Sequence, residues 1–356
     1  MKATRQEEEL ERLLKMIRPG DGAAKEEASR RWDSIAKPLH SLGKLERDII
    51  RIAGIQRTAA VRLEKKALLV LCADNGVVEE GVTQTGQEVT AIVAENFLTG
   101  NTSAAIMAQK AGVDLFPIDM GMAADTQVPN YKVAYGTRNM AKEPAMTREQ
   151  ALQAVLTGIR LAKEKKEEGY DLLAVGEMGI GNTTTSSAVS SLLLGREIQE
   201  MTGRGAGLTS QGLERKIRVI REAIRRNRPD PSDSLDVLAK VGGFDLAGLA
   251  GVCLGGAVYG IPVVLDGFIS GAAALAAVRL CPTVREYLIA SHVSKEPGMR
   301  AILTELGLEA ALDCGLCLGE GTGALLYLPA LLMAEEVYRS MSTFSENQIE
   351  EYQELT

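Results

Sequence analysis

The first 65 residues of the chain predict helices. A break falls at Pro19-Gly20, because proline and glycine both interrupt a helix. On each side of the break, apolar residues recur every three or four positions, which is the spacing of a helix with one buried face. These positions are Leu10, Leu13, Leu14 and Ile17, followed by Leu45, Ile49, Ile50 and Ile52.

Beyond residue 65 the pattern changes to short continuous apolar runs. Residues 67–73 read ALLVLCA, which predicts a strand buried on both faces. Similar runs occupy 113–118, 172–175, 263–265 and 287–290, and helical segments separate most of them. This alternation predicts an α/β fold in which helices cover both faces of a parallel sheet.

Several of these runs end in polar or glycine-rich turns. In an open α/β sheet, the turns after the strands share one edge, and ligands bind there. The predicted turns are Asp74-Asn75-Gly76, Asp119-Met120-Gly121, residues 176–179, Asp266-Gly267 and Ser291-His292. The ligand site is therefore expected at this edge of the sheet.

The end of the chain returns to a helical pattern. Residues 323–338 read GALLYLPALLMAEEVY, a helix that Pro329 is expected to kink, and a polar tail follows. Terminal helices from both ends are expected to pack together. The prediction is a small helical domain of residues 1–65 plus 325–356 and a large α/β domain of residues 66–324.

Composition and charge narrow the class of protein. The chain has 356 residues, 46% of them hydrophobic, with 36 glycines and a net charge of −7. A length of this order suffices for one large α/β domain, and the acidic balance argues against a nucleic-acid partner. The start is polar and acidic, without a basic and apolar leader pattern. We expect a soluble cytoplasmic protein with no membrane partner.

Cysteine usage points to reduced, structural thiols. The chain has five cysteines, an odd number, and most of them lie in apolar contexts. Cys314 and Cys317 form a C-x-x-C pair, for which a redox or metal role is the alternative. No second Cys or His pair of suitable spacing lies nearby, so no metal site is predicted.

The glycine-rich segment 176–185 is a candidate anion site. It follows a predicted strand and leads into a predicted helix at residues 186–194. Glycines allow close backbone approach, and the N–H groups at a helix start point at an anion. The segment matches neither the P-loop nor the dinucleotide pattern. An ordinary tight turn with a threonine cap is the alternative.

A second glycine-dense loop spans residues 202–208, and Lys216 follows on a predicted basic helix at residues 213–226. Lys216 is a candidate partner of Glu177 or of a phosphate. The alternative is a solvated surface lysine, which is the common state of lysine on such a helix.

Glu320 is the sharpest local signal. It stands between Gly319 and Gly321 at the start of the apolar C-terminal helix. A carboxylate in that setting is reachable by a ligand yet poorly solvated, which raises its pKa toward that of a general base. The alternative is a charge that compensates a helix N-terminus.

Two further segments carry polar groups beside apolar ones. Residues 74–78 and 87–90 surround a loop whose composition suits an aromatic heterocycle, or an ordinary capped loop. His292 is one of only two histidines, and a structural or ligand-orienting role is favoured because no catalytic partner can be assigned to it.

Taken together, these segments resemble the nicotinate-nucleotide:dimethylbenzimidazole phosphoribosyltransferase family, and the likeness runs through nearly the whole chain. The matching motifs are residues 37–46 (KPLHSLGKLE), 73–77 (ADNGV), 87–90 (QEVT), 176–184 (GEMGIGNTT), 243–245 (GFD), 265–268 (LDGF), 291–292 (SH) and 318–323 (LGEGTG). One departure is Asn75, where the family usually has histidine. The stretch with Cys314 and Cys317 is also less typical.

The resemblance implies a Rossmann-like three-layer parallel sheet, a homodimer and an active site at the carboxyl edge of the strands. It implies transfer of phosphoribose from nicotinate mononucleotide to a benzimidazole-type base, without a cofactor. Glu320 is the expected catalytic base and Glu177 the second expected catalytic residue. Glu177 and Lys216 form a second charged pair near the nucleotide. The expected substrate-binding residues are Thr83, Gln87, Glu88, Gly179, Gly181, Asn182, Thr183, Gly203, Lys216, Asp266, Gly267, Ser291 and Leu318.

Within that set, residues 179–183 are expected to hold phosphate or ribose, Asp266, Gly267 and Ser291 to orient the nucleotide, and loop 83–88 to line the base pocket. Two other functions stay open. One is a catalytically silent nucleotide-binding sensor, since a fold does not fix a function. The other keeps the donor and uses a phenolic or purine acceptor.

Overall fold

The computed structural model describes residues 4–353. Its centre is a five-stranded sheet in the order β2-β1-β3-β4-β5, and all neighbouring strands are parallel. The strands are β1 (Lys66–Ala73), β2 (Asp114–Gly121), β3 (Leu172–Met178), β4 (Val263–Leu265) and β5 (Leu288–Ala290). The expected α/β class and parallel sheet are confirmed.

Three expected details of the strands are wrong. The predicted turn at Asp119-Met120-Gly121 is the end of β2, because the pairing with β1 continues to Gly121. Asp119 is tolerated inside the strand because Lys132 forms an ion pair with its carboxylate at 2.8 Å. Residues 176–178 likewise belong to β3, paired with β1, and Tyr287 belongs to a 3-10 helix before β5.

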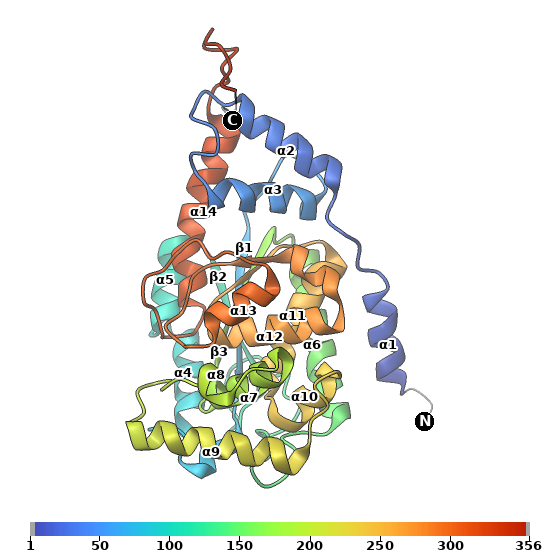
Figure 1. Cartoon of the computed structure of the whole chain (residues 1–356), viewed down its shortest axis with the longest axis vertical. Coiled ribbons are helices and arrows are strands. Elements are labelled where there is room, and N and C mark those ends of the chain that lie inside the picture. Colours follow the sequence, from blue (N-terminus) through green and yellow to red (C-terminus); the bar gives the residue numbers. More distant parts are fainter. Residues whose placement is uncertain (1–3, 354–356) are drawn as a thin grey trace.

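Helices cover both faces of the sheet (Figure 1). Alternate residues of β1 divide between two cores. Leu69 and Leu71 join the core with α6, α11 and α12, whereas Leu68 and Val70 join the core with α3, α5 and α14. The helices are α1 (Arg5–Leu14), α2 (Gly22–Ser34), α3 (Lys44–Gln56), α4 (Glu88–Leu98), α5 (Ser103–Ala111), α6 (Arg148–Glu167), α7 (Asn182–Leu194), α8 (Ile198–Met201), α9 (Ser210–Asn227), α10 (Ser234–Val241), α11 (Phe244–Tyr259), α12 (Phe268–Leu280), α13 (Met299–Leu306) and α14 (Thr322–Ser340), with 3-10 helices η1 (Gly76–Glu80) and η2 (Pro282–Tyr287).

The terminal segments pack together as expected. Trp32 of α2 lies 5.0 Å from Tyr338 of α14, measured between ring centroids, and Arg31 donates to the Tyr338 carbonyl at 3.1 Å. Helix α1 lies apart from this group, against α6 (Figure 1). Its Leu10 and Leu13 belong to the hydrophobic core that contains α6, α11 and α12. The proposed division into two domains stays a prediction.

The helices begin in two ways. Outside the cavity described below, most N-caps are polar side chains; Thr102, for example, accepts a hydrogen bond from the Ala105 N–H at the start of α5. Three helices that start at the carboxyl edge of the sheet, α7, α12 and α14, have the glycine N-caps Gly181, Gly267 and Gly321 and no side-chain cap of their own. Backbone there can approach a ligand closely.

No helix among residues 4–353 is long and apolar enough to cross a membrane. Pro329 lies inside α14, which continues through it to Ser340.

Candidate active site

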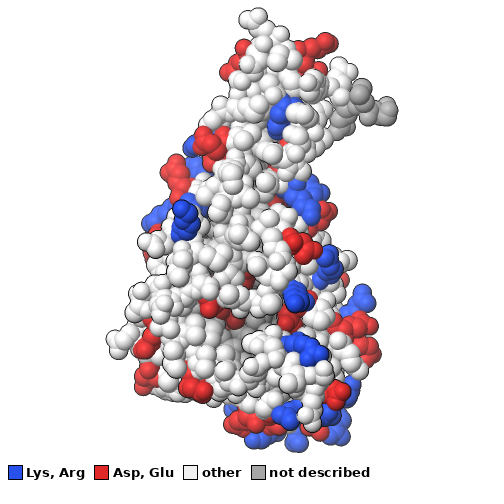
Figure 2. Space-filling model, turned by 90° about the vertical axis from the view of Figure 1, so that its left-hand side faces the viewer, with Lys and Arg blue, Asp and Glu red and all other residues white. Residues whose placement is uncertain are grey.

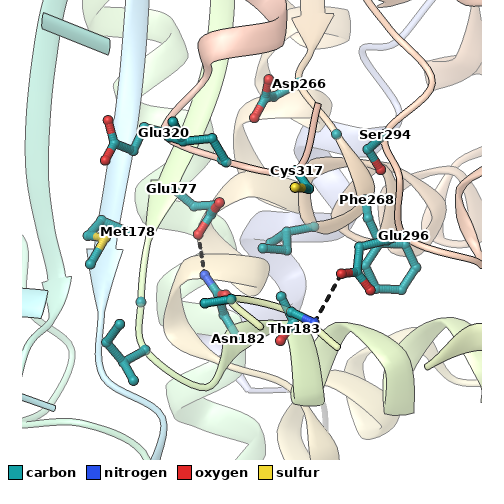
Figure 3. Close-up of a pocket in the computed structure, with 18 of the residues that line it drawn as sticks. Glu177, Met178, Asn182, Thr183, Asp266, Phe268, Ser294, Glu296, Cys317 and Glu320 are labelled. Carbon is teal, nitrogen blue, oxygen red and sulfur yellow. Dashed lines mark hydrogen bonds between the residues drawn. The ribbon is translucent and has the colours of Figure 1, made fainter. Parts of the chain in front are cut away.

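A cavity of about 290 Å³ opens at the carboxyl edge of the sheet. It begins beside the β1–β3 pair, where the chain order reverses, and such a switch point is the usual ligand site of an open parallel sheet. Segments 82–85, 177–183, 266–270 and 316–320 line it, together with residues of the 204–208 loop and His292, Ser294 and Glu296. Segments distant in sequence therefore meet at one place (Figure 3).

Ten of the fifteen predicted site residues line this cavity: Thr83, Glu177, Gly179, Gly181, Asn182, Thr183, Asp266, Gly267, Leu318 and Glu320. The other five lie outside the lining. Gln87 and Glu88 begin α4, Gly203 and Lys216 lie behind Thr183, and Ser291 lies behind Asp266. The roles of all fifteen in substrate binding stay predictions.

Glu320 sits in a strained turn. Gly319, Glu320 and Gly321 have φ angles of 91°, 60° and 84°, so three successive residues adopt the left-handed region that favours glycine. A non-glycine residue persists there only when its surroundings fix it. Gly176 of β3 presses directly on the backbone of Glu320, where a Cβ would approach to 2.6 Å. Contact with β3 therefore fixes the backbone of Glu320 in this turn.

The Glu320 carboxylate accepts a hydrogen bond from the Ala104 N–H at 3.2 Å, at the start of α5. The side chain thus does compensate a helix N-terminus, but that of α5 and not of α14. Burial raises the pKa of Glu320, and the Ala104 N–H opposes part of the rise. The carboxylate lines the cavity, half-buried, with the elevated basicity that a general base requires.

Glu177 is held inside a small buried network. It points toward Asn182, whose side-chain amide donates to Glu177 and also to Asp245 at 3.1 Å (Figure 3). Burial, with Asp245 adding to it, raises the pKa of Glu177 to about 8. Burial raises the pKa of Asp245 to about 6. Burial and the neighbouring carboxyl of Asp245 therefore favour the protonated form of Glu177.

Lys216 is almost fully buried, with 1% of its surface exposed. It donates to the Thr183 hydroxyl at 2.8 Å and to the Gly203 carbonyl at 3.2 Å, so its partner is Thr183 and not Glu177. Burial lowers its pKa to about 8. The expected helix is confirmed as α9, which carries Lys216 on its buried face. The solvated alternative is wrong.

The glycine segment is partly helical. Gly181, with φ 95°, is the N-cap of α7, so Asn182 and Thr183 form its first turn. The alternative of a threonine cap is wrong, because α7 has no side-chain cap. A Cβ on Gly179 would come within 2.4 Å of the Ala73 carbonyl, so only glycine fits there. This leaves the α7 N-terminus open to the cavity.

Asp266 points at the start of α14. Its carboxylate accepts hydrogen bonds from the N–H groups of Gly321 at 3.2 Å, Gly323 at 2.7 Å and Ala324 at 3.3 Å. Ser291 donates to the Asp266 carbonyl at 3.1 Å. Burial raises the pKa of Asp266 to about 7, and the three N–H groups oppose the rise.

Several residues in and around the cavity were not among the predicted site residues, although Phe268 and Asp245 belong to the matching motifs. Phe268, Ser294 and Glu296 form the wall opposite Glu320 (Figure 3), and Glu296 accepts from the Gly205 N–H at 3.2 Å. Asp245 lies behind Glu177 and shares its Asn182 partner. Asp245 carried a usable signal, since it is an acidic residue at the start of an otherwise apolar helix. Glu296 had no such signal in the sequence, because it lies in an ordinary polar loop.

Within residues 4–353 no three His, Cys, Asp or Glu side chains are grouped so as to hold a metal ion. All five cysteines are free thiols; Cys314 and Cys317 are exposed, and Cys317 lines the cavity.

A parallel sheet with glycine N-caps, a buried lysine and a basic carboxylate around one cavity defines an α/β enzyme that acts on a small phosphorylated ligand. The comparisons with known proteins give the family. The family model described as phosphoribosyltransferase matches residues 17–349. The chain belongs to the nicotinate-nucleotide–dimethylbenzimidazole phosphoribosyltransferase family.

Relatives of that name are similar over nearly their whole length. The Ruminiclostridium cellulolyticum protein is 46% identical over 93% of this chain and 95% of its own. The Acetivibrio thermocellus protein is 48% identical over 91% and 93%. The crystal structure of CobT from Thermus thermophilus superposes with a TM-score of 0.88 at 40% identity, covering 93% of this chain and 100% of the other.

Proposed function

We propose that this protein transfers the phosphoribosyl group of nicotinate mononucleotide to 5,6-dimethylbenzimidazole or a related base, giving α-ribazole phosphate and nicotinate. The observation that carries the proposal is Glu320, a carboxylate of raised pKa fixed in a glycine turn at the cavity. The names of the relatives reported above specify these two substrates.

Glu320 acts as general base. One nitrogen of the benzimidazole attacks the anomeric carbon of the ribose, and Glu320 takes the proton from the other nitrogen. The bond between the anomeric carbon and nicotinate breaks, and its electron pair returns to the pyridinium nitrogen, which becomes neutral. Attack from the face opposite the leaving group converts a β-nucleotide into an α-nucleotide. The leaving group is already activated, so positioning is the main remaining task.

The nucleotide phosphate binds at the start of α7. Thr183 lies in its first turn and is backed by Lys216, which together supply a hydroxyl, backbone N–H groups and a positive charge. Gly203 belongs to the loop that carries the second Lys216 contact. Gly267 and Ser291, beside Asp266, border the nucleotide on the other side.

The acceptor base occupies the side of the cavity near Thr83 and Leu318. Leu318 is 55% exposed at the cavity mouth, an unusual exposure for leucine. The apolar Leu318 side chain beside the Thr83 hydroxyl suits a heterocycle, which needs an apolar surface and a polar contact. Gln87 and Glu88, at the start of α4, border the same loop.

Glu177 serves as a neutral acid. Its raised pKa keeps it protonated beside Glu320, so the two carboxyls need not carry like charges at neutral pH. Its contacts with Asn182 tie it to the first turn of α7.

The test is direct. The protein is mixed with nicotinate mononucleotide and a panel of benzimidazoles, phenols and purines, and free nicotinate and α-nucleotide are measured. Product with 5,6-dimethylbenzimidazole supports the proposal. If product forms only with a phenol or purine, that compound is the acceptor and the proposed benzimidazole is not. If the donor binds but no base gives product, the protein is a catalytically silent nucleotide binder.

The protein forms a homodimer through the face of α4, α5 and α14. Figure 2 shows this side with few charges along its middle, and large apolar side chains are exposed on it. These are Ile92, Leu98, Ile106, Leu326 and Met333, with exposures between 41% and 65%. A patch of this kind is unusual on a monomer and supports a protein interface.

Light scattering after size-exclusion chromatography tests the dimer. Ile106→Glu in α5 places a charge in the interface and is expected to give monomers. Met16→Glu, at an apolar residue 45% exposed just after α1, is the matched control and should keep the dimer. A monomeric wild-type protein would contradict the assignment.

The enzyme works in a reducing compartment such as the cytoplasm. Its five cysteines are free, and two of them, Cys314 and Cys317, are exposed three residues apart. Exposed thiols with this spacing persist where the environment is reducing. Cell fractionation with an antibody to the chain checks the location.

A further inference from the structure

The start of α14 lacks a cap of its own. Its N-cap, Gly321, has no side chain. The Thr322 N–H donates to the Gly319 carbonyl at 3.0 Å, but the N–H groups of Gly323 and Ala324 need an acceptor from outside the helix. Asp266, which follows β4 more than fifty residues earlier in the chain, supplies both carboxylate oxygens to Gly321, Gly323 and Ala324. A buried aspartate therefore caps this helix from another strand.

The capped turn is the one that carries Glu320. Three successive residues with positive φ end at Gly321, whose N–H is bound by Asp266. A non-glycine residue in the left-handed region is strained, so the turn relaxes unless contacts on both sides fix it. One side is the Thr322 hydroxyl, which donates to the Gly319 carbonyl at 2.8 Å. Asp266 supplies the other.

His292 stands beside the Asp266 carboxylate. Its Nδ1 lies 4.0 Å from a carboxylate oxygen, and burial lowers the pKa of His292, which disfavours the charged ring. The ring instead fills the space beside Gly323, where a Cβ would approach His292 to 1.9 Å. His292 thus packs against the first turn of α14, on the same side as Asp266.

We infer that Asp266 is a positioning residue for the catalytic base: its carboxylate holds the Gly319–Gly321 turn that orients Glu320, and it acts through Glu320 without itself engaging the reacting atoms. The inference rests on the proposed function. It replaces the expectation that the Asp266 carboxylate orients the nucleotide, because both of its oxygens already accept backbone N–H groups.

A double-mutant cycle tests this inference. Single-turnover rates and donor affinities are measured for the wild type, Asp266→Ala, Glu320→Gln and the double variant. Asp266→Ala should lower the rate about 100-fold, as expected for a displaced catalytic group, with donor affinity nearly unchanged. In the Glu320→Gln background the same change should have almost no further effect on rate, because the group it positions is gone.

Asp266→Asn is the second variant, in case the alanine variant does not fold. Its remaining carbonyl oxygen can accept the Gly323 N–H, so an intermediate rate is expected with the same donor affinity. Asp21→Ala is the matched control: Asp21 caps α2 through the Ala24 N–H at 2.9 Å, far from the cavity, and its loss should lower thermal stability without changing the rate.

Two results overturn the inference. One is multiplicative rate losses in the double variant, which would show that Asp266 acts independently of Glu320. The other is weaker donor binding with an unchanged rate, which would make Asp266 a nucleotide ligand. Both presuppose an active wild-type enzyme. A wild type that forms no α-nucleotide refutes the proposed function instead, so the two failures are distinguishable.

Discussion

The Lys216 ammonium donates to the Thr183 hydroxyl at 2.8 Å from an almost fully buried position. Thr183 lies in the first turn of α7, so the charge sits directly behind the open N-terminus of that helix. Burial of a lysine without a carboxylate contact is costly, and an anion at the helix start offsets that cost. This relationship supports the α7 N-terminus as the proposed phosphate site.

Replacement of Lys216 by methionine should weaken donor binding. Loss of a charge-assisted contact costs about 1.5–3 kcal/mol, so the KM for nicotinate mononucleotide is expected to rise roughly tenfold or more, with a smaller change in kcat. Steady-state kinetics measure both. Arg218→Met, at an exposed position of the same helix, is the control and should leave KM unchanged.

Donor capture should also weaken in alkaline solution. The pKa of Lys216 is lowered to about 8, and a lysine is charged only below its pKa, so the positive charge fades as pH rises through 8. The value of kcat/KM for the donor should therefore fall above about pH 8, since this ratio reports the free enzyme. Lys216→Met should lack this alkaline limb, and a limb that persists in the variant would assign it to another group.

Glu320→Gln should abolish most turnover while leaving the donor bound. Glutamine keeps an oxygen that can accept the Ala104 N–H but cannot take a proton. A general base contributes about 10²–10⁴-fold, so kcat should fall by that factor. Release of nicotinate measures turnover, and calorimetry measures donor binding. Glu222→Gln, on the surface of α9, serves as control; normal turnover in Glu320→Gln would remove this residue from the mechanism.

The stability of the protein should fall between about pH 4.5 and pH 8. The pKa of Glu177 is raised from 4.5 to about 8, so across this window the folded state binds a proton that the unfolded chain has lost. The stabilising contribution is complete below pH 4.5 and is lost as pH rises through 8. Glu177→Gln cannot ionise, so its loss of unfolding free energy between pH 5 and pH 8 should be smaller by on the order of 3 kcal/mol. Urea unfolding at the two pH values checks this.

One side chain connects two loops that line the cavity. The Gln84 amide donates to the Gly207 carbonyl and so connects loop 82–85 with loop 204–208. Gln84→Ala should free both loops, raise the KM for both substrates a few-fold and speed tryptic cleavage after the exposed Arg204. Gln211→Ala, nearby on α9, is the control. An unchanged cleavage rate would show that the bridge does not hold the loops.

Much of the fold could be predicted because burial on both faces marks a central parallel strand. Residues 67–73 are apolar without interruption and became β1. The strand ends were harder to locate. Glu177 and Asp119 have acidic side chains, yet their strands continue past them, because Asn182 and Lys132 supply partners from outside those strands. Such pairing leaves no mark in the strand's own sequence, and neither does the order of the strands.

The site was predictable where glycine limits the backbone and less so elsewhere. The glycines around Glu320 and before Asn182 mark turns that only glycine can form, and these residues line the cavity. Gln87 and Glu88 match a family motif but begin α4, outside the lining. Glu296 lines the cavity because the chain after β5 folds back over the 204–208 loop, a contact between segments about ninety residues apart.

The position of Glu320 has a consequence for how the enzyme is made. The strands and most of the cavity wall lie before residue 300, and they leave the ribosome well ahead of α14. Since chains begin to fold during synthesis, the proposed phosphate site at α7 is made before Glu320. Under the proposed mechanism, activity therefore waits until α14 packs with its first turn against Asp266.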